Sequence, residues 1–203
     1  MNKPKLTYFD MAASRGEECR LALHIAGVDF EDNRIVRADW PAMKPTTPFG
    51  SLPVFEIPGK APLAQSNAIL VHVGRRHGLH PKDDFEAARH EAMMAHVEDA
   101  RAHITPSMRM SDEAQKKAAR EALVAGYLPA WAGFAEKQIG EGPFLGGANL
   151  QVADIKIYVV YKWIVGGIID HIPTDIFASY PKLKRVHDAV AAHPGVVAWY
   201  GRG

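Results

Sequence analysis

The chain has 203 residues, of which 47% are hydrophobic and 23% are charged, a composition typical of a globular protein with a sizeable core. Its 24 basic and 23 acidic residues leave a net charge of +1, which argues against nucleic acid or an anionic membrane as the main partner. A single cysteine excludes an internal disulfide and any CxxC site. Without a secretion signal or a membrane-spanning apolar run, we expect a cytoplasmic protein.

The first 80 residues alternate between strand-like and helix-like segments. The run Lys5–Phe9 is rich in β-forming residues and predicts a strand. Arg15–Ala26 predicts a helix that ends at Gly27, with Glu17 and Glu18 suited to the positive end of its dipole. The order then continues with a weaker strand over Phe30–Ile35, an irregular segment, a strand over Leu52–Ile57, a hairpin partner over Pro62–Ala64 and a helix over Asn67–His77.

Strand signals disappear after Pro81. Four helices are predicted, over Asp83–Met110, Asp112–Ile139 with a bend near Pro129, Ala153–Ile169, and Pro181–His193 ended by Pro194–Gly195. The third is apolar almost all round and is expected at the centre of a bundle. Buried positions on the first are expected at Phe85, Ala92, Met93, Val97 and Ile104. These patterns predict an α/β domain over residues 1–80 and an all-α domain over residues 84–203.

Two polar positions lie where a strand or turn leads into a helix. Tyr8 ends the first strand, and its hydroxyl can point toward the N-terminus of the next helix, which is a ready anion site. Judged by position alone, a core tyrosine is the simpler interpretation. After Gln65, Ser66 either caps the helix Asn67–His77 or binds a carboxylate with its hydroxyl and the free backbone N–H groups.

Three further residues, Pro53, Trp40 and Lys44, allow both a structural and a ligand-binding interpretation when each is taken singly. Pro53 opens a strand either as an edge residue or after a cis bond, and a cis bond would direct the backbone of Leu52 at a ligand. Trp40 and Lys44 lie in a proline-flanked loop, where an indole N–H and an ammonium can both reach a carboxylate. Both residue types are also common in loops that bind nothing.

The order of these motifs is more specific than any one of them. The chain carries, in sequence, the runs KLTYFDMAASRGEECR, EDNRIVRADWPAMKPTTPFGSLPVFEI and LAQSNAIL. Together they resemble the glutathione S-transferase family, most closely its sigma class, which includes glutathione-dependent prostaglandin D synthases. The resemblance implies a thioredoxin-like first domain, a helical bundle as the second, a homodimer, and glutathione as co-substrate with no metal.

The resemblance also implies roles for individual residues. Tyr8 is the expected catalytic residue and donates a hydrogen bond to the glutathione sulfur. The expected glutathione-binding set is Tyr8, Arg15, Trp40, Lys44, Ser51, Leu52, Pro53, Gln65, Ser66 and Asp99. Asp99, found by an ungapped count from Gln65, would reach the glutathione of the partner subunit. An apolar electrophile is expected in a pocket lined by Phe9, Met11, Ala13, Met108 and Met110.

Two departures from the family pattern concern helix starts. One residue is inserted after Met11, so Arg15 is the best match to the family's helix-start arginine, and Ser14 is either an N-cap or a substitute for Tyr8. Before the central helix, Gln151 stands where the family has Ser or Thr, so Asn149 is an alternative cap.

The expected function is activation of the glutathione thiol as thiolate for attack on apolar electrophiles, with peroxidase or isomerase activity as variants. The alternative is a non-catalytic protein that binds glutathione or apolar ligands on the same fold. Cys19 lies inside a predicted helix with no base beside it, so we expect a buried structural thiol. His96 and His103 are two helical turns apart, which is too far for one metal ion.

Overall fold

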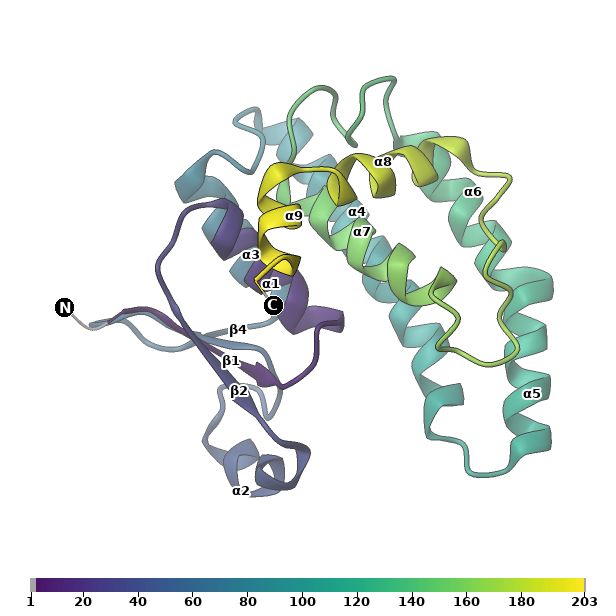
Figure 1. Cartoon of the computed structure of the whole chain (residues 1–203), viewed down its shortest axis with the longest axis horizontal. Coiled ribbons are helices and arrows are strands. Elements are labelled where there is room, and N and C mark those ends of the chain that lie inside the picture. Colours follow the sequence, from purple (N-terminus) through teal and green to yellow (C-terminus); the bar gives the residue numbers. More distant parts are fainter. Residues whose placement is uncertain (1–2, 203) are drawn as a thin grey trace.

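The computed structural model describes residues 3–202 and combines a four-stranded sheet with a larger helical part (Figure 1). The strands are β1 (Lys5–Phe9), β2 (Glu31–Ile35), β3 (Val54–Glu56) and β4 (Leu63–Ala64), in the spatial order β2-β1-β3-β4. β2 is parallel to β1, whereas β3 is antiparallel to both β1 and β4. The four predicted strands therefore form, although β3 is shorter than the predicted run.

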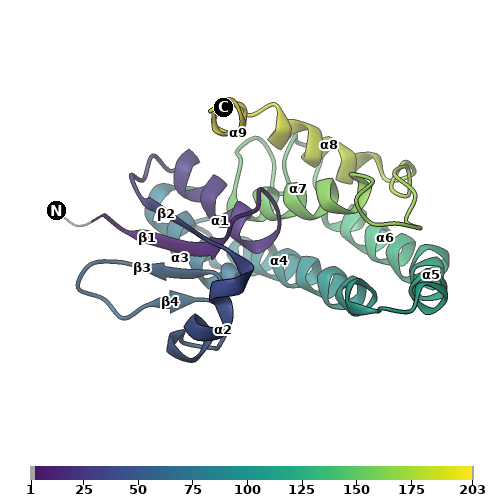
Figure 2. The ribbon, with the colours of Figure 1, turned by 60° about the horizontal axis from the view of Figure 1, so that its bottom comes forward.

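Helices α1 (Ser14–Ile25) and α3 (Ser66–His77) follow β1 and β4 and pack against each other. Between β2 and β3, where only an irregular segment is expected, the chain forms the short helix α2 (Trp40–Met43). Turns of 3₁₀ helix over Arg37–Asp39 and Lys44–Thr46 flank it. Figure 2 shows this segment leaving the end of β2 beside the sheet.

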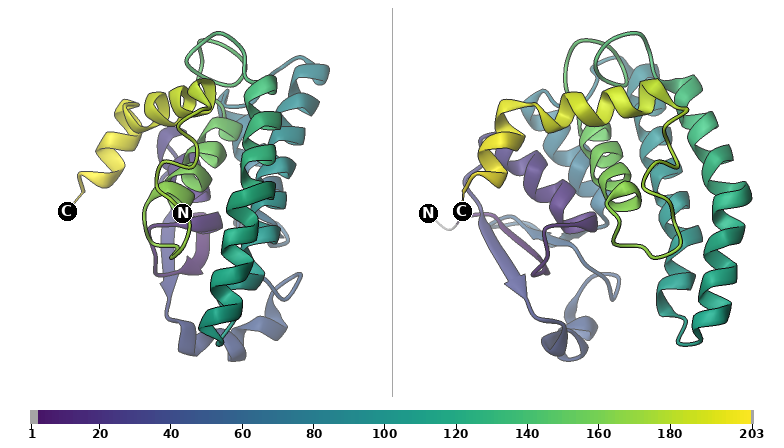
Figure 3. Two further views of the ribbon diagram at one scale, coloured as in Figure 1. Left: turned by 90° about the vertical axis from the view of Figure 1, so that its right-hand side faces the viewer. Right: turned by 45° about the vertical axis from the view of Figure 1, so that its right-hand side comes forward.

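The regular elements described after residue 81 are all helical, as predicted, and lie side by side in several views (Figures 1 and 3). They are α4 (Asp84–Ile104), α5 (Glu113–Ala122), α6 (Leu128–Gln138), α7 (Val152–Val165), α8 (Pro181–Ala191) and α9 (Pro194–Tyr200). Helix α7 packs on α1, α4 and α8, so the predicted central helix is confirmed.

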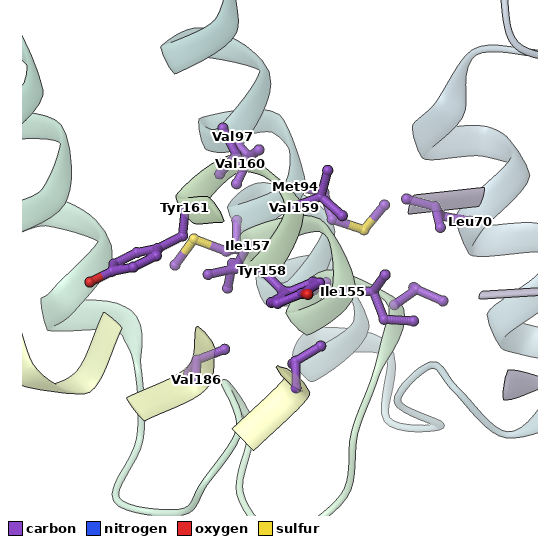
Figure 4. Packing of buried hydrophobic residues seen from close by; sticks show 14 of the residues in the cluster. Leu70, Met94, Val97, Ile155, Ile157, Tyr158, Val159, Val160, Tyr161 and Val186 are labelled. Atoms are coloured by element: carbon purple, nitrogen blue, oxygen red, sulfur yellow. The ribbon is translucent and has the colours of Figure 1, made fainter. Parts of the chain in front are cut away.

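Helix α7 is buried on nearly every side because apolar side chains project all round its axis. Figure 4 shows Val159 and Val160 of this helix near Met94 and Val97 of α4, and Val186 of α8 belongs to the same cluster. Two ionisable residues, Asp154 and Lys156, are also fully buried in this helix.

The core-facing side of α4 differs from the prediction at two positions. Met93, Val97 and Ile104 are buried, but Phe85 is 74% exposed and Ala92 is also exposed. The buried residues recur at helical spacing along one face, and both exposed residues fall on the opposite face. Apolar character alone does not identify the side of a helix that meets its neighbours.

The second predicted helix is interrupted just before Pro129. A π-helical turn over Leu123–Tyr127 separates α5 from α6, and Pro129 is the second residue of α6. The proline nitrogen carries no hydrogen to donate to the preceding turn, so the regular hydrogen-bond pattern breaks there.

The expectation that Pro194–Gly195 only terminates a helix is wrong. Pro194 begins α9, and the ring of His193 accepts a hydrogen bond from Gly195 N–H at 3.1 Å. Proline is favoured in the first turn of a helix, where its missing N–H costs nothing. Among residues 3–202, no helix is both long and apolar enough to cross a membrane.

Candidate active site

The sheet register gathers most of the predicted site residues at one edge. Thr7 of β1 and Ala64 of β4 both pair with Val54 of β3. The next residue along β1 is Tyr8, the residue before Val54 is Pro53, and Gln65 and Ser66 follow β4 directly. Because β2 is parallel to β1, the segment that carries Trp40 and Lys44 leaves from the same edge.

Tyr8 is buried between the sheet and the first turn of α1. A Cβ atom added to Gly16 would lie 2.1 Å from Cδ1 of Tyr8, so the backbone of α1 rests on the phenol ring. The guanidinium of Arg20 lies 5.8 Å from the ring centroid. Both contacts come from α1, so the start of this helix holds the Tyr8 ring in place.

Arg20 also holds the turn that follows Tyr8. It is fully buried and donates to the carbonyl oxygens of Met11 (2.8 Å) and Phe9 (3.1 Å) and to Oδ1 of Asp32 (2.7 Å). The Phe9 ring in turn lies 6.0 Å from the indole of Trp40, edge to face. One buried arginine therefore connects the end of β1 to β2 and α1.

The loop before β3 carries four of the predicted residues. Lys44 is exposed, and its side chain runs along Gly50, where an added Cβ would be 3.5 Å from Lys44 Cε. Ser51 and Leu52 are half-buried, and the Leu52–Pro53 peptide bond is cis. The loop thus places an ammonium and backbone groups beside Tyr8's end of the sheet.

The two helix starts at this edge are capped differently from the prediction. Ala13 is the N-cap of α1, while Ser14 is the first helical residue with φ +64° and provides no capping bond. At α3 the N-cap is Gln65, with φ +72°, and Ser66 is the first helical residue. Neither serine is the N-cap of its helix, in contrast to the prediction.

Arg15 lies at the exposed side of a charge cluster that the sequence does not indicate. Its Nε and Nη2 atoms donate to Oε2 of Glu98 at 2.9 and 2.6 Å. Oε1 of Glu98 accepts from Arg101 (2.8 Å) and Lys156 (2.5 Å), and both of these cations also bind Glu18 (3.0 and 2.6 Å). Glu18, Lys156 and Arg101 are 0 to 3% exposed.

The cluster shifts the ionisation of its acids. Burial by itself raises the pKa of Glu98, but the Lys156 ammonium, the Arg101 guanidinium and Arg15 outweigh it and lower that pKa to about 2. Burial and the neighbouring Glu18 raise the pKa of the Cys19 thiol well above its usual range. Cys19 is a buried thiol held in its protonated form, in agreement with the structural role expected for it.

Other predicted residues lie farther from this edge. Asp99 is exposed on α4, and its carbonyl oxygen contacts the ring of His103. Met108 is half-exposed in the 3₁₀ turn Thr105–Arg109 that ends α4, and Met110 follows that turn. That these methionines line one pocket with Phe9, Met11 and Ala13 stays a prediction.

The residues that sequence reasoning missed are Gly16, Glu18, Glu98, Arg101 and Lys156. The sequence did contain a signal: Glu18 and Lys156 each lie in a helix that is otherwise expected to be buried. A buried charge requires a partner of opposite charge, so the two residues could have been expected to lie near such partners. Among residues 3–202, no group of three or more His, Cys, Asp or Glu side chains could hold a metal ion.

Comparisons with known proteins agree on one family. Residues 4–75 match the model of the glutathione S-transferase N-terminal domain, and residues 98–202 match that of the C-terminal domain. The chain is 34% identical to glutathione S-transferase 1 of Ascaris suum, over 98% of this chain and 96% of that one. It is 30% identical to hematopoietic prostaglandin D synthase of Gallus gallus, over 96% and 94%.

A similar solved structure is prostaglandin synthase D of Nilaparvata lugens. It superposes with a TM-score of 0.87 at 33% identity and covers 98% of both chains.

Proposed function

The chain belongs to the glutathione S-transferase family and is a glutathione transferase, and we propose that Tyr8 activates the thiol of glutathione at the sheet edge described above. The family uses glutathione as co-substrate. The observation that carries the proposal is that the register brings Tyr8, Pro53 and Ser66 together where α1 and α3 begin. Free N–H groups at helix starts favour an anionic ligand.

The chemistry required of Tyr8 is modest. A free thiol with a pKa near 8.5 is roughly 3% ionised at neutral pH. Lowering that pKa by about two units requires roughly 2.7 kcal/mol and increases the thiolate fraction about 25-fold. One hydrogen bond from the Tyr8 hydroxyl to the sulfur, together with the α1 N-terminus, supplies an effect of this size. Tyr8 acts as a donor and stays protonated.

The remaining residues bind three different parts of glutathione. Trp40 and Lys44 hold the glycine carboxylate, and backbone groups of Ser51 and Leu52 beside Pro53 pair with the cysteinyl part. Gln65 and Ser66 hold the γ-glutamyl group. Arg15, fixed by Glu98, adds positive charge near the sulfur end.

Further features follow the family pattern. The chain forms a homodimer in which Asp99 reaches the partner subunit's glutathione, and it is cytoplasmic. The boundary between its domains falls at residues 80–84. The electrophile binds against Phe9, Met11 and Ala13, with Met108 and Met110 on the helical side; soft, flexible methionines suit irregular apolar substrates.

The test of Tyr8 is the variant Tyr8→Phe. We expect it to bind glutathione while the pKa of the bound thiol rises by about two units and conjugation of an aryl halide at neutral pH falls about 25-fold. Ultraviolet absorbance of the thiolate across a pH series gives the pKa. Tyr127→Phe, a change remote from the sheet edge, is the matched control. An identical thiol titration in Tyr8→Phe and the parent protein would overturn the assignment.

Substrate class is tested with the purified protein, glutathione and three electrophiles: an aryl halide, an organic peroxide and an unsaturated ketone. Turnover of one or more identifies conjugation or peroxidase activity. Binding of glutathione with no turnover of any would instead support the non-catalytic alternative.

A further inference from the structure

Lys156 is a fully buried cation whose three N–H donors all have partners. Its Nζ atom lies 2.6 Å from Oε1 of Glu18, 2.5 Å from Oε1 of Glu98 and 3.4 Å from Oγ of Ser66. An ammonium group only donates hydrogen bonds, so Ser66 Oγ is the acceptor in the third contact. Nothing in the chemistry proposed above uses this lysine.

The cluster around Lys156 joins the two parts of the molecule. Glu18 comes from α1 and Ser66 from α3, whereas Glu98 and Arg101 come from α4 and Lys156 from α7. The cluster carries a positive excess, because Lys156, Arg101 and Arg15 face only two carboxylates, those of Glu18 and Glu98. The side chain of Arg15 is 37% exposed, but Arg15 shares Glu98 with Lys156 and Arg101, so the two carboxylates do not fully balance the buried cations.

Ser66 is the point where this excess meets the candidate ligand site. It is 4% exposed, and the hydrogen bonds among residues 3–202 provide no acceptor for its own hydroxyl proton. Since Lys156 occupies a lone pair of Oγ, the proton is left to be donated elsewhere. Ser66 also begins α3, where backbone N–H groups point outward.

We propose that Lys156 is a positioning residue for glutathione binding: it fixes the Ser66 hydroxyl as a donor toward the ligand's γ-glutamyl carboxylate and places a buried positive charge behind it. The inference rests on the proposed function, in which Ser66 holds that carboxylate. The lysine acts through Ser66 and contacts neither the sulfur nor the electrophile. It therefore affects glutathione affinity and not the ionisation of the thiol.

A purely structural role would require only that Glu18 and Lys156 satisfy each other. Removing one of them leaves the other buried without its main partner, so single variants confuse stability with binding. Replacing both by apolar residues of similar size is often neutral for stability. The pair Glu18→Leu with Lys156→Met removes one positive and one negative charge, so the net charge of the cluster stays the same. Arg101 and Arg15 still pair with Glu98, and the contact to Ser66 is lost.

The experiment is a double-mutant cycle on the full chain, with reduced glutathione as the probe and calorimetry as the readout. We expect the Glu18→Leu/Lys156→Met protein to bind glutathione about tenfold more weakly, with KM raised by the same factor. We expect kcat to stay within about twofold of the parent, and the thiol pKa to stay within about 0.3 unit of the parent value. In a Ser66→Ala background, the same pair of substitutions should change affinity less than twofold. Arg101→Met, in the same cluster but without contact to Ser66, is the matched control.

The outcomes separate the inference from the proposed function. Unchanged affinity in the parent background, or an equal loss in both backgrounds, overturns the role of Lys156. If Ser66→Ala itself binds glutathione as tightly as the parent, the Ser66 assignment in the proposed function fails instead. Should the apolar pair unfold, Glu18→Gln/Lys156→Gln keeps hydrogen bonding, removes the charge, and is judged by the same readouts.

Discussion

At the scale of single residues, the site depends on close contacts that hold Tyr8 in place. Gly16 lets the α1 backbone approach the phenol ring, and Arg20 ties the carbonyl oxygens after β1 to the helix. Neither residue needs to touch glutathione. Their effect is to give the Tyr8 hydroxyl a fixed direction, because a buried ring in close contact with a helix has few alternative rotamers.

The corresponding prediction concerns Gly16→Ala. The new methyl group would lie 2.1 Å from Tyr8 Cδ1, so the ring or the helix must shift. We expect a loss of about 1–3 kcal/mol in unfolding free energy and a large loss of conjugation activity. Gly126→Ala is the control, since nothing lies within 4 Å of its added Cβ. Urea unfolding should show that protein equal to or slightly more stable than the parent; equal behaviour of the two variants contradicts the prediction.

At the scale of elements, helix starts show how a local signal depends on its surroundings. Asp83 caps α4 in solvent, and its Oδ1 accepts from the N–H groups of Phe85 (3.1 Å) and Glu86 (2.9 Å). At α7 the N-cap is Gln151, and the alternative cap Asn149 is not used. Asp154, in the first turn and fully buried, accepts from Leu145 N–H (2.7 Å) and Gln151 N–H (2.8 Å), and burial raises its pKa to about 7.

The two aspartates therefore differ in what their removal costs. Asp83→Ala exposes two N–H groups to water, and we expect a loss of about 1 kcal/mol in unfolding free energy. Asp154→Ala leaves two buried donors without acceptors, at about 1–3 kcal/mol each, so a loss of at least about 2 kcal/mol is expected. Chemical denaturation of both variants decides the matter, and a larger loss for Asp83→Ala would refute the argument.

At the scale of the whole molecule, α7 and the last helix join the two parts. α7 carries Lys156 into the cluster with α1 and α4, and the indole of Trp199 on α9 donates to Glu17 on α1 at 2.7 Å. Removal of α9 would therefore affect the helix that supports Tyr8. Stability and site geometry depend on the same contacts.

The stability of the whole molecule depends on pH, and His90 is one residue that contributes to this dependence. Burial, with help from His80 and Arg89, lowers the pKa of His90 to about 4 from an ordinary 6.5. The unfolded chain therefore binds more protons between these values, so the stability that His90 contributes is present above pH 6.5 and is lost as pH falls through 4. The 2.5-unit difference corresponds to about 3 kcal/mol.

The variant His90→Leu isolates this contribution. We expect the difference in unfolding free energy between variant and parent to move by about 3 kcal/mol in favour of the variant between pH 7 and pH 4. Urea unfolding of both proteins across this range measures it. A difference that stays constant with pH would contradict the assignment.

The sequence alone predicted the fold class and the family. Strands, turns and helices follow local periodicity and turn residues, which act between neighbours, and the ordered motifs around Tyr8, Trp40 and Ser66 indicate the glutathione S-transferase family. The thioredoxin-like domain followed by helices is confirmed. The roles of the individual site residues stay predictions.

Tertiary structure alone decided which side of each helix is covered and which charges are buried. Phe85 is exposed despite its apolar side chain, whereas Glu18 and Lys156 are fully buried although both are charged. Their charged partners are between 58 and 138 residues away in sequence, and local sequence patterns do not indicate contacts over such separations. A buried charge is stable only when several distant elements bring its counter-charges together, and that condition exists only in the folded chain.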